Sequence, residues 1–282
     1  MEISKEGFKT VKGIDGSIQL LFDSNKANEC CNFAIANKID IISLYPEVYT
    51  AKDLEPIFSI SKFIKGLLLD DRVHYGNLCL FSNLTFLSVP DNGKDTVDLS
   101  FFPQLEMCGV TFSERLQGLE SCSNLKSLTV SNYKSKIKDL SALPSLNNLE
   151  HLSLIKTDIT TLQGIERFSN LKKFEIFGAS KLKTIAALQA LSNSIEEIQV
   201  EQCKKINDYE TLGKVKSLKK IILSESGEIK SLAFVKELPR LEFISFWGTN
   251  VLDGNIKYCE GINYVGFDNK KHYTHKSEQF KK

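Results

Sequence analysis

A short pattern of apolar positions recurs along most of the chain. Leu149-Glu-His-Leu152-Ser-Leu154 has the form L-x-x-L-x-L. The same form starts at Leu84, Leu105, Leu125, Leu171, Ile195, Leu218, Leu241 and Ile262, with weaker copies at Ile39 and Ile64. From Ile64 onward, successive copies start 20 to 24 residues apart. Because successive side chains of a strand point to opposite sides, the x-L-x-L alternation predicts short strands with one buried face, ten or eleven of them.

A second period separates these strands. Apolar side chains fall at every third residue in four segments: Ile159 to Phe168, Leu182 to Leu191, Ile206 to Val215 and Ile229 to Leu238. This spacing predicts 3-10 turns, in which side chains three apart eclipse, although one distorted helical turn also fits. Each unit is therefore a strand, a turn and a short helical return. Stacked units share one core, so the fold class is an α/β solenoid with a parallel strand ladder.

The combined pattern, L-x-x-L-x-L-x-x-[N/C/T]-x-[L/I], resembles the leucine-rich-repeat family, and its I-x-x-L-x-x-L returns are similar to internalins and to the phosphatase-regulator-like class. The resemblance covers roughly Ile39 to Phe267. It implies a horseshoe with a curved parallel sheet whose concave face binds partners. It also implies a buried polar ladder at the eighth residue after the first leucine. That position holds Thr157, Cys203, Ser226 and Thr249, with Asn92 and Ser113 earlier and Ala179 as an interruption.

The two ends depart from the repeat. Residues 1–38 are expected to form an N-terminal cap, with a strand from Ile18 to Phe22 and an amphipathic helix that ends near Ala36 and is capped by Ser24 or Asn25. The array then occupies residues 39–267. Residues 268–282 are polar and basic, and we expect a loose C-terminal cap or a disordered end there.

Composition narrows the partners and the compartment. The 36 basic residues nearly balance the 35 acidic ones, and a net charge of +1 gives no reason to expect a nucleic acid or membrane partner. The first residues lack the basic start and apolar core of a signal peptide, and no run of 18 apolar residues occurs. Seven cysteines without disulfide or metal spacing favour a reducing compartment. A cytoplasmic location is therefore expected.

Candidate chemistry is sparse. Cys122 and Cys259 stand three residues before a first leucine, Cys108 takes a second-leucine position and Cys203 a ladder position, so these thiols are expected in the core. Cys30, Cys31 and Cys79 are expected to be packed as well. His272-x-x-His275 lacks further ligands at metal-binding spacing, and the usual catalytic motifs are absent from the sequence. We therefore expect no metal, no cofactor and no enzymatic activity.

The outward strand positions supply a candidate interface. If the second and third leucines of each copy point inward, the residues two, four and six places after the first leucine point outward. Large apolar side chains recur at these outward positions beside charged ones, as is typical of a binding surface. The candidate partner-binding residues are His151, Ile155, Lys173, Glu175, Phe177, Glu197, Glu201, Lys220, Phe243, Trp247 and Tyr264. Ser153 and Ser245 are expected to face outward as well. In the alternative interpretation, the C-terminal tail folds over Phe243, Trp247 and Tyr264 as a cap.

These observations favour a monomeric, non-enzymatic module that binds one protein partner. The ending Tyr264-Val-Gly-Phe267-Asp-Asn-Lys-Lys-His272-Tyr-Thr-His275 resembles small standalone bacterial repeat proteins, which implies a cytosolic bacterial protein that neutralises a toxin domain, as immunity proteins do. The alternative is a delivered effector or host-interaction protein that uses the same surface. A repeat-bearing ubiquitin ligase is disfavoured, because about 15 residues after Phe267 leave no room for a catalytic domain.

Overall fold

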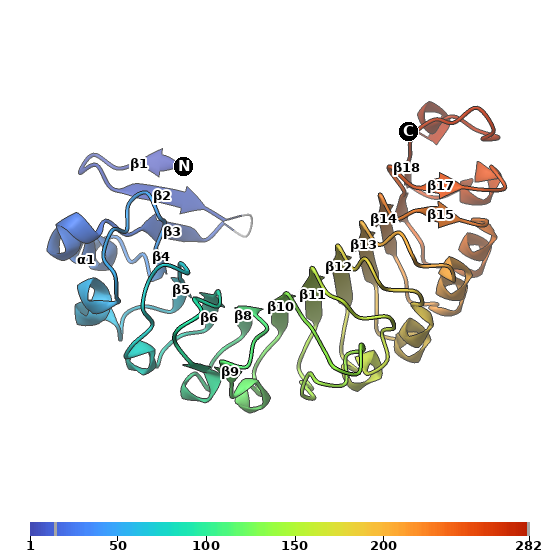
Figure 1. Ribbon diagram of the computed structural model, residues 1–282. Coiled ribbons are helices and arrows are strands. Elements are labelled where there is room, and N and C mark those ends of the chain that lie inside the picture. The colour runs from blue at the N-terminus through green and yellow to red at the C-terminus, as the bar shows by residue number, and fades with distance from the viewer. Residues whose placement is uncertain (14–15, 281–282) are drawn as a thin grey trace. The chain divides into compact units, whose positions relative to one another are not determined.

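The computed structural model describes residues 1–13 and 16–280, and the chain divides into two compact units, Met1–Leu128 (unit 1) and Thr129–Lys282 (unit 2). Within each unit, strands lie side by side in a ladder, and the 3-10 returns connect one strand to the next (Figure 1). Strand β10 (Ser127–Ser131) lies at the boundary between the units.

Unit 1 has an antiparallel start followed by a parallel ladder. Its main sheet contains β1 (Glu2–Ile3), β2 (Lys9–Lys12), β3 (Ile18–Leu21), β4 (Ile41–Ser43), β5 (Gly66–Leu68), β6 (Phe86–Val89) and β8 (Met107–Thr111), in that order. A small second sheet pairs β7 (Val97–Asp98) with β9 (Leu116–Gln117). The helical segments are η1 (Ser24–Lys26), α1 (Ala27–Ala36), η2 (Glu55–Ile60), η3 (Leu78–Leu80), η4 (Leu99–Phe101) and η5 (Leu119–Ser121). The β1–β2 and β2–β3 pairs are antiparallel, and the pairs from β3 to β8 are parallel.

Unit 2 is a parallel ladder of repeats. Its main strands are β11 (His151–Ile155), β12 (Lys173–Phe177), β13 (Glu197–Glu201), β14 (Lys220–Ser224), β16 (Phe243–Ser245) and β18 (Tyr264–Gly266). A side sheet pairs β15 (Glu228–Ile229) with β17 (Asn250–Val251). The returns are η6 (Ile165–Arg167), η7 (Ala186–Leu191), η8 (Tyr209–Lys214), η9 (Ala233–Glu237) and η10 (Ile256–Cys259), and η11 (Ser277–Phe280) follows β18. The expected 3-10 returns are confirmed.

The core lies between the strands and the returns of each repeat. Leu152 and Leu154 from β11 are fully buried, as are Ile159 and Leu162 from the period-three segment that follows. The ladder positions bond to neighbouring main chain: the Thr249 hydroxyl donates to the carbonyl oxygen of Leu223 at 2.7 Å. Similar bonds come from Thr157, Ser226 and the Cys203 thiol, while Ala179 fills its position as a buried small side chain. Apolar burial and satisfied main-chain carbonyls together hold the stack.

All eleven predicted repeat strands are present, and so is the strand expected at Ile18. The N-terminal details differ from the expectation. Asp23, not Ser24 or Asn25, caps the first helical turn, because its Oδ1 accepts a bond from the Asn25 amide at 3.0 Å. The Ser24 hydroxyl is used elsewhere and accepts a bond from the Thr50 amide at 2.8 Å. The hairpin of β1 and β2 was not predicted.

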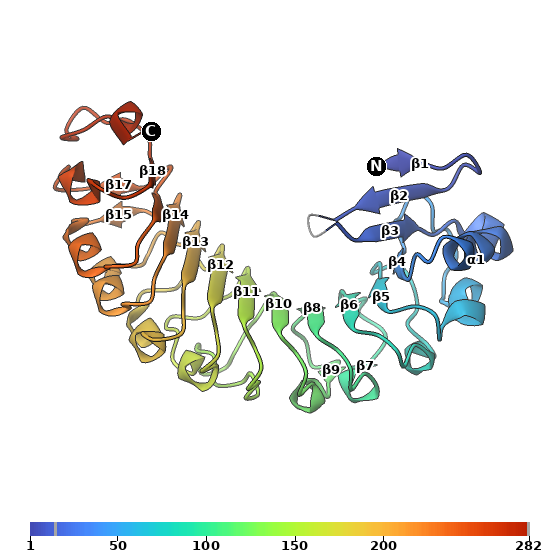
Figure 2. The same cartoon turned by 180° about the vertical axis from the view of Figure 1, so that it is seen from behind.

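The segment after β18 packs against the last repeat, as Figure 2 shows from behind. The Thr274 amide donates to the Gly254 carbonyl at 2.9 Å, and the Phe280 ring meets the buried Phe267 ring edge-on, with 6.0 Å between centroids. Gly254 has a positive φ of 62°, and a Cβ there would lie 2.2 Å from the His272 carbonyl oxygen. Glycine is therefore required where the C-terminal segment passes close to this main chain. Lys281 and Lys282 of the expected tail lie outside the described residues.

Candidate functional site

The outward side chains of β11 to β18 in unit 2 form ordered rows, and we call this surface the strand face. Parallel register places residues of neighbouring strands directly opposite one another. The first row consists of His151, Lys173, Glu197, Lys220, Phe243 and Tyr264. The middle row consists of Ser153, Glu175, Gln199, Ile222, Ser245 and Gly266, and the last row begins with Ile155, Phe177 and Glu201. All candidate residues from the sequence therefore belong to one unit, and strand pairing sets the order of all of them except Trp247, which follows β16.

Glu175 is the centre of an ion-pair cluster at the β11 end of this face. Its Oε2 lies 2.8 Å from His151 Nε2, and its Oε1 lies 2.8 Å from Lys173 Nζ. Only 13% of the Glu175 side chain is exposed. The hydrogen bond from His151, with help from Lys173, outweighs partial burial and lowers the pKa of Glu175 to about 2. The carboxylate is therefore ionised at neutral pH and fixed in position.

The charged row leads into an aromatic stack. Lys220 Nζ lies 3.7 Å from Glu197 Oε2 and 5.4 Å from the centroid of the Phe243 ring. The rings of Phe243 and Tyr264 are stacked, with centroids 4.3 Å apart and an interplanar angle of 8°. A cation, a phenyl ring and a phenol ring thus follow one another on three adjacent strands. Such cation–π and stacking contacts orient these side chains while leaving them partly exposed.

The Tyr264 ring lies over Gly266, because a Cβ at Gly266 would be 2.9 Å from the Tyr264 ring and hydroxyl and 3.2 Å from Trp247 Nε1. The small middle-row residue makes room for the ring. Tyr264 is 46% exposed and Trp247 is 44% exposed, so the C-terminal segment leaves these two side chains accessible. Their roles in binding stay a prediction.

Two further candidates lie apart from this stack. Ile155 and Phe177 are half-buried neighbours on β11 and β12. Strands β13 and β14 separate Phe177 from the Phe243–Tyr264 stack, a distance of about 14 Å at usual strand spacing. Glu201 lies in the last row, beside Phe177 and 3.5 Å from the Gln199 amide nitrogen. The strand face therefore carries two apolar patches with charged side chains between them.

Two serines expected on the outward side lie in the outward middle row but are covered. Ser153 and Ser245 occupy the middle row, but both are buried. Their side chains are small, and the same row contains Gly266, over which the Tyr264 ring lies. Simple alternation predicts the direction of a side chain, but not whether its neighbours cover it.

A hollow of about 640 Å³ lies beside β18, at the end of the strand face. It is lined by Trp247, Asn263, Tyr264, Val265, Phe267, Asp268, Asn269, Ser277, Glu278 and Phe280. Sequence reasoning identified Trp247 and Tyr264 but missed the contributions from η11. The aromatic residue Phe280 in an otherwise polar segment was the available signal, because a large apolar ring is usually buried against a neighbour.

The cysteines do not form a reactive site within the described residues. Burial raises the pKa of the Cys122 thiol to about 11 and that of Cys259 to about 12, so both are protonated at neutral pH. Cys30, Cys31, Cys108 and Cys203 are buried as expected. The expectation that Cys79 is packed is wrong: it is exposed in the middle of η3, between the buried side chains of Leu78 and Phe81. The described residues contain neither a cluster of three metal-ligating side chains nor a helix long and apolar enough to cross a membrane.

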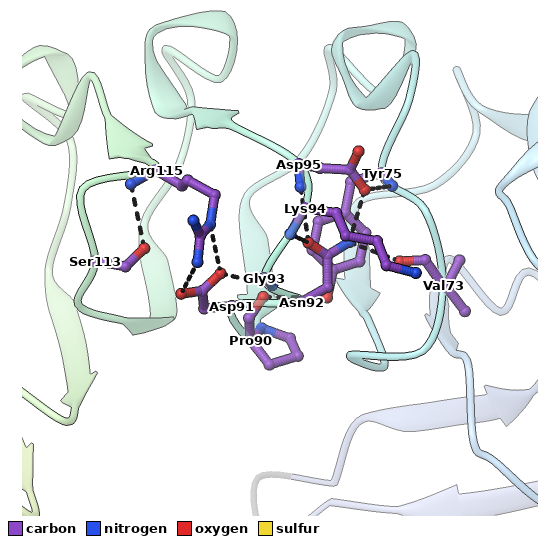
Figure 3. A network of polar contacts seen from close by, with 10 residues as sticks. All are labelled: Val73, Tyr75, Pro90, Asp91, Asn92, Gly93, Lys94, Asp95, Ser113 and Arg115. Atoms are coloured by element: carbon purple, nitrogen blue, oxygen red, sulfur yellow. Dashed lines mark hydrogen bonds and ion pairs between the residues drawn. The ribbon is translucent and has the colours of Figure 1, made fainter.

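Unit 1 contains a polar network of a different kind (Figure 3). The Asn92 amide donates to the Val73 carbonyl at 2.9 Å and to the Asp95 carboxylate at 2.6 Å, and its oxygen accepts from the Lys94 and Asp95 amides. The Asp95 carboxylate also accepts from the Tyr75 amide at 2.7 Å. Asn92, a predicted ladder residue, therefore links two successive repeats through main-chain groups.

Arg115 extends this network to the next repeat. Its Nε and Nη2 lie 3.1 and 3.2 Å from the two carboxylate oxygens of Asp91, a two-point contact (Figure 3). The hydrogen bond from Arg115 lowers the pKa of Asp91. Ser113, also predicted as a ladder residue, accepts a bond from the Arg115 amide at 3.3 Å. These side chains satisfy one another, so the network is a structural link between repeats.

Comparisons with solved structures identify the fold. The functional domain of InlJ from Listeria monocytogenes, described as including a cysteine ladder, is 16% identical to this chain, with a TM-score of 0.55 over 81% of this chain and 47% of that one. The internalin InlF from Listeria monocytogenes is 14% identical, with a TM-score of 0.43 over 82% and 78%. A leucine-rich-repeat protein of Leptospira interrogans is 15% identical, with a TM-score of 0.35 over 82% and 79%. This chain spans less than half of the InlJ domain.

No family model and no curated protein matches the sequence. The repeat pattern, the parallel ladder and the likeness to InlJ nevertheless agree. The protein has the leucine-rich-repeat fold.

Proposed function

We propose that this protein is a non-enzymatic module that binds one protein partner through the strand face of unit 2. The observation that carries the proposal is the stack of Phe243 and Tyr264 beside Trp247, with almost half of the Tyr264 and Trp247 surfaces exposed. Exposed aromatic groups gathered on one surface are costly in water and typical of interface centres. The buried, protonated thiols of Cys122 and Cys259 support a binding role over thiol catalysis.

The charged rows support a protein partner over a nucleic acid. Glu175, Glu197 and Glu201 place carboxylates in the middle of the strand face. A phosphate backbone would be repelled there, because nucleic-acid binding depends on neutralising phosphates with basic groups. Lys173 and Lys220 alternate with these carboxylates, and a mixed pattern of this kind selects a partner with complementary charges.

Within this class, we assign the protein to the cytosol of a bacterium, as a monomer that sequesters a toxin domain. The support is the resemblance of its ending to small standalone bacterial repeat proteins and the mixed chemistry of the strand face. The second candidate is an effector or host-interaction protein that uses the same surface. The likeness to the InlJ domain favours neither, since at 16% identity it concerns the fold alone.

The test is quantitative capture of a partner from cells of the source organism. Wild-type protein is compared with Phe243→Ala/Tyr264→Ala, and Leu252→Ala is the matched control because Leu252 is a 48% exposed apolar residue that follows β17. We expect one protein that is retained by the wild type and the control and lost by the double variant. Equal capture by all three would place the binding surface elsewhere.

The captured protein then separates the two candidates. If it arrests growth when expressed alone in the bacterium and growth returns when this chain is co-expressed, the toxin-neutralising role holds. A captured protein that comes from a host cell, and from no component of the bacterium, supports the effector role. Binding to neither would contradict both assignments.

A further inference from the structure

The hollow beside β18 has an unusual combination of walls. Four of its lining side chains are aromatic: Trp247, Tyr264, Phe267 and Phe280. Two more, Asp268 and Glu278, are carboxylates, and none of the lining residues that the structure describes is Lys, Arg or His. Aromatic faces and carboxylates both attract cations, so the chemistry of the hollow selects for positive charge.

The aromatic wall already accepts a cation at its other end. Phe243 covers one face of the Tyr264 ring, and Lys220 Nζ lies 5.4 Å from the Phe243 centroid. Tyr264 lines the hollow and Phe243 does not, which leaves the opposite face of the Tyr264 ring toward the hollow. A second cation placed there would complete a stack with a positive group at each end.

Hydrogen bonds hold the two carboxylates in place. Asp268 Oδ2 accepts a bond from the Gly248 amide at 2.7 Å, which ties it to the turn that carries Trp247. Both Glu278 carboxylate oxygens lie 3.1 Å from the Asn269 side-chain nitrogen. The neutral Gly248 amide positions the Asp268 carboxylate without cancelling its charge. Among the described residues, Asp268 forms no salt bridge.

We propose that this hollow is a subsite for a guanidinium group, filled by an arginine side chain of the protein partner. The identity of the occupant rests on the proposed function, while the cation preference rests on the hollow itself. Arginine fits better than lysine, because a planar guanidinium stacks on the Tyr264 ring while its N–H groups donate to Asp268. Lysine would offer a point charge and lose the stacking contact.

The chain contains a single tryptophan, which makes Trp247 a reporter placed in the hollow wall. Its indole N–H gives one resonance in a proton–nitrogen correlation spectrum. The probe is N-acetyl-arginine amide, titrated at low salt. N-acetyl-citrulline amide, which has nearly the same shape without the charge, is the matched negative probe, and N-acetyl-lysine amide compares the two cations.

We expect a saturable shift of the indole resonance with the arginine probe, a weaker response to the lysine probe and almost none to the citrulline probe. Asp268→Asn/Glu278→Gln keeps the shape and one oxygen acceptor of each side chain and removes the charges, so we expect it to weaken arginine binding about tenfold. Glu228→Gln, an exposed carboxylate on β15, is the control and should leave binding unchanged. Equal responses to arginine and citrulline, or full binding by the double variant, would overturn the proposal.

The terminal lysines of the chain supply a competing occupant. If Lys281→Gln/Lys282→Gln binds the arginine probe and the wild type does not, the hollow belongs to the protein's own tail, and the assignment to a partner is wrong. The titration needs no partner, so its failure would leave the strand-face proposal standing. Loss of partner capture in Phe243→Ala/Tyr264→Ala would support the strand face as the binding surface. If Asp268→Asn/Glu278→Gln still binds the arginine probe fully, the guanidinium subsite is rejected.

Discussion

The two units place their polar side chains in opposite ways. In unit 1, Asn92 and Asp95 bond to main-chain groups and to each other, and Arg115 bonds to Asp91, so the contacts span three repeats. In unit 2, Glu175 and Lys220 bond to side chains on the strand face. The first arrangement holds the repeats together, and the second places charged groups on an outward surface. The same repeat pattern therefore allows polar side chains either to link repeats or to lie on the outward surface.

The strands of the two units also differ in length and in their outward residues. Strands β11 to β14 have five residues each, which gives long rows in strict register. Strands β4 and β5 have three residues each. Where unit 2 has Lys173 and Glu197 in its first row, unit 1 has Gly66 and Phe86 at the corresponding positions of β5 and β6. The charged outward residues, rather than strand length, favour unit 2 as the binding surface, because β16 and β18 also have only three residues each.

The largest expected effect concerns stability in unit 1. Asn92→Ala removes a side chain with hydrogen bonds to two repeats, and we expect it to lower the free energy of unfolding by about 2 kcal/mol. Asn83→Ala, which loses one exposed bond to the Lys62 carbonyl, is the control and should cost much less. Denaturant unfolding measures both. Equal small losses would show that the network does not hold unit 1 together.

The buried thiols should have a similar, smaller role in both units. Cys122→Ala and Cys259→Ala each leave a small cavity, and we expect a loss of about 1 kcal/mol. Cys79→Ala, at an exposed position, should be neutral. If either buried change abolished partner binding in a folded protein, the assignment of these thiols to the core would fail.

Acid should affect the strand face through Glu175. Its folded-state pKa of about 2 lies below the ordinary value of about 4.3, so the ion pairs contribute stability above that value and lose it as pH falls toward 2. We expect the melting temperature of the wild type to fall more steeply from about pH 4.5 to about pH 2 than that of Glu175→Gln. Parallel curves would contradict the cluster around Glu175.

The smallest effect concerns the rate of association. Glu197→Lys/Glu201→Lys reverses two charges on the strand face, and we expect slower binding to the partner, with a larger difference at low salt. Glu210→Lys/Glu228→Lys reverses two charges off the main strands and serves as the control. Stopped-flow measurement at two salt concentrations tests this. A rate insensitive to both changes would separate the acidic row from partner encounter.

The sequence predicts the repeats well because alternation and the period of three report burial directly. The eleven strands and the buried positions from Ile159 to Phe168 follow from those periods. The β1–β2 hairpin lies outside the repeat and has too few residues for a pattern. The Asp91–Arg115 contact joins loops 24 residues apart, and its formation depends on loop geometry.

The sequence predicts to which face the side chains of the candidate site point, but not how they pack against one another. Strand alternation places Lys173, Glu197 and Phe243 on one face. The pairing register confirms this: Lys173 is paired with Glu197, and Lys220 lies between Glu197 and Phe243. The covering of Gly266 by the Tyr264 ring depends on side-chain rotamers, which a sequence pattern does not contain. That these residues bind a partner stays a prediction.

The most direct test measures the dissociation constant and the melting temperature of the same variants. With the captured partner, we expect Trp247→Ala to weaken binding about tenfold or more, about 1.4 kcal/mol per decade, with an unchanged melting temperature. Leu252→Ala should match the wild type in both quantities. If Trp247→Ala instead lowers the melting temperature and leaves the affinity of the folded fraction unchanged, the aromatic residues serve the C-terminal cap and the strand face is not the binding surface.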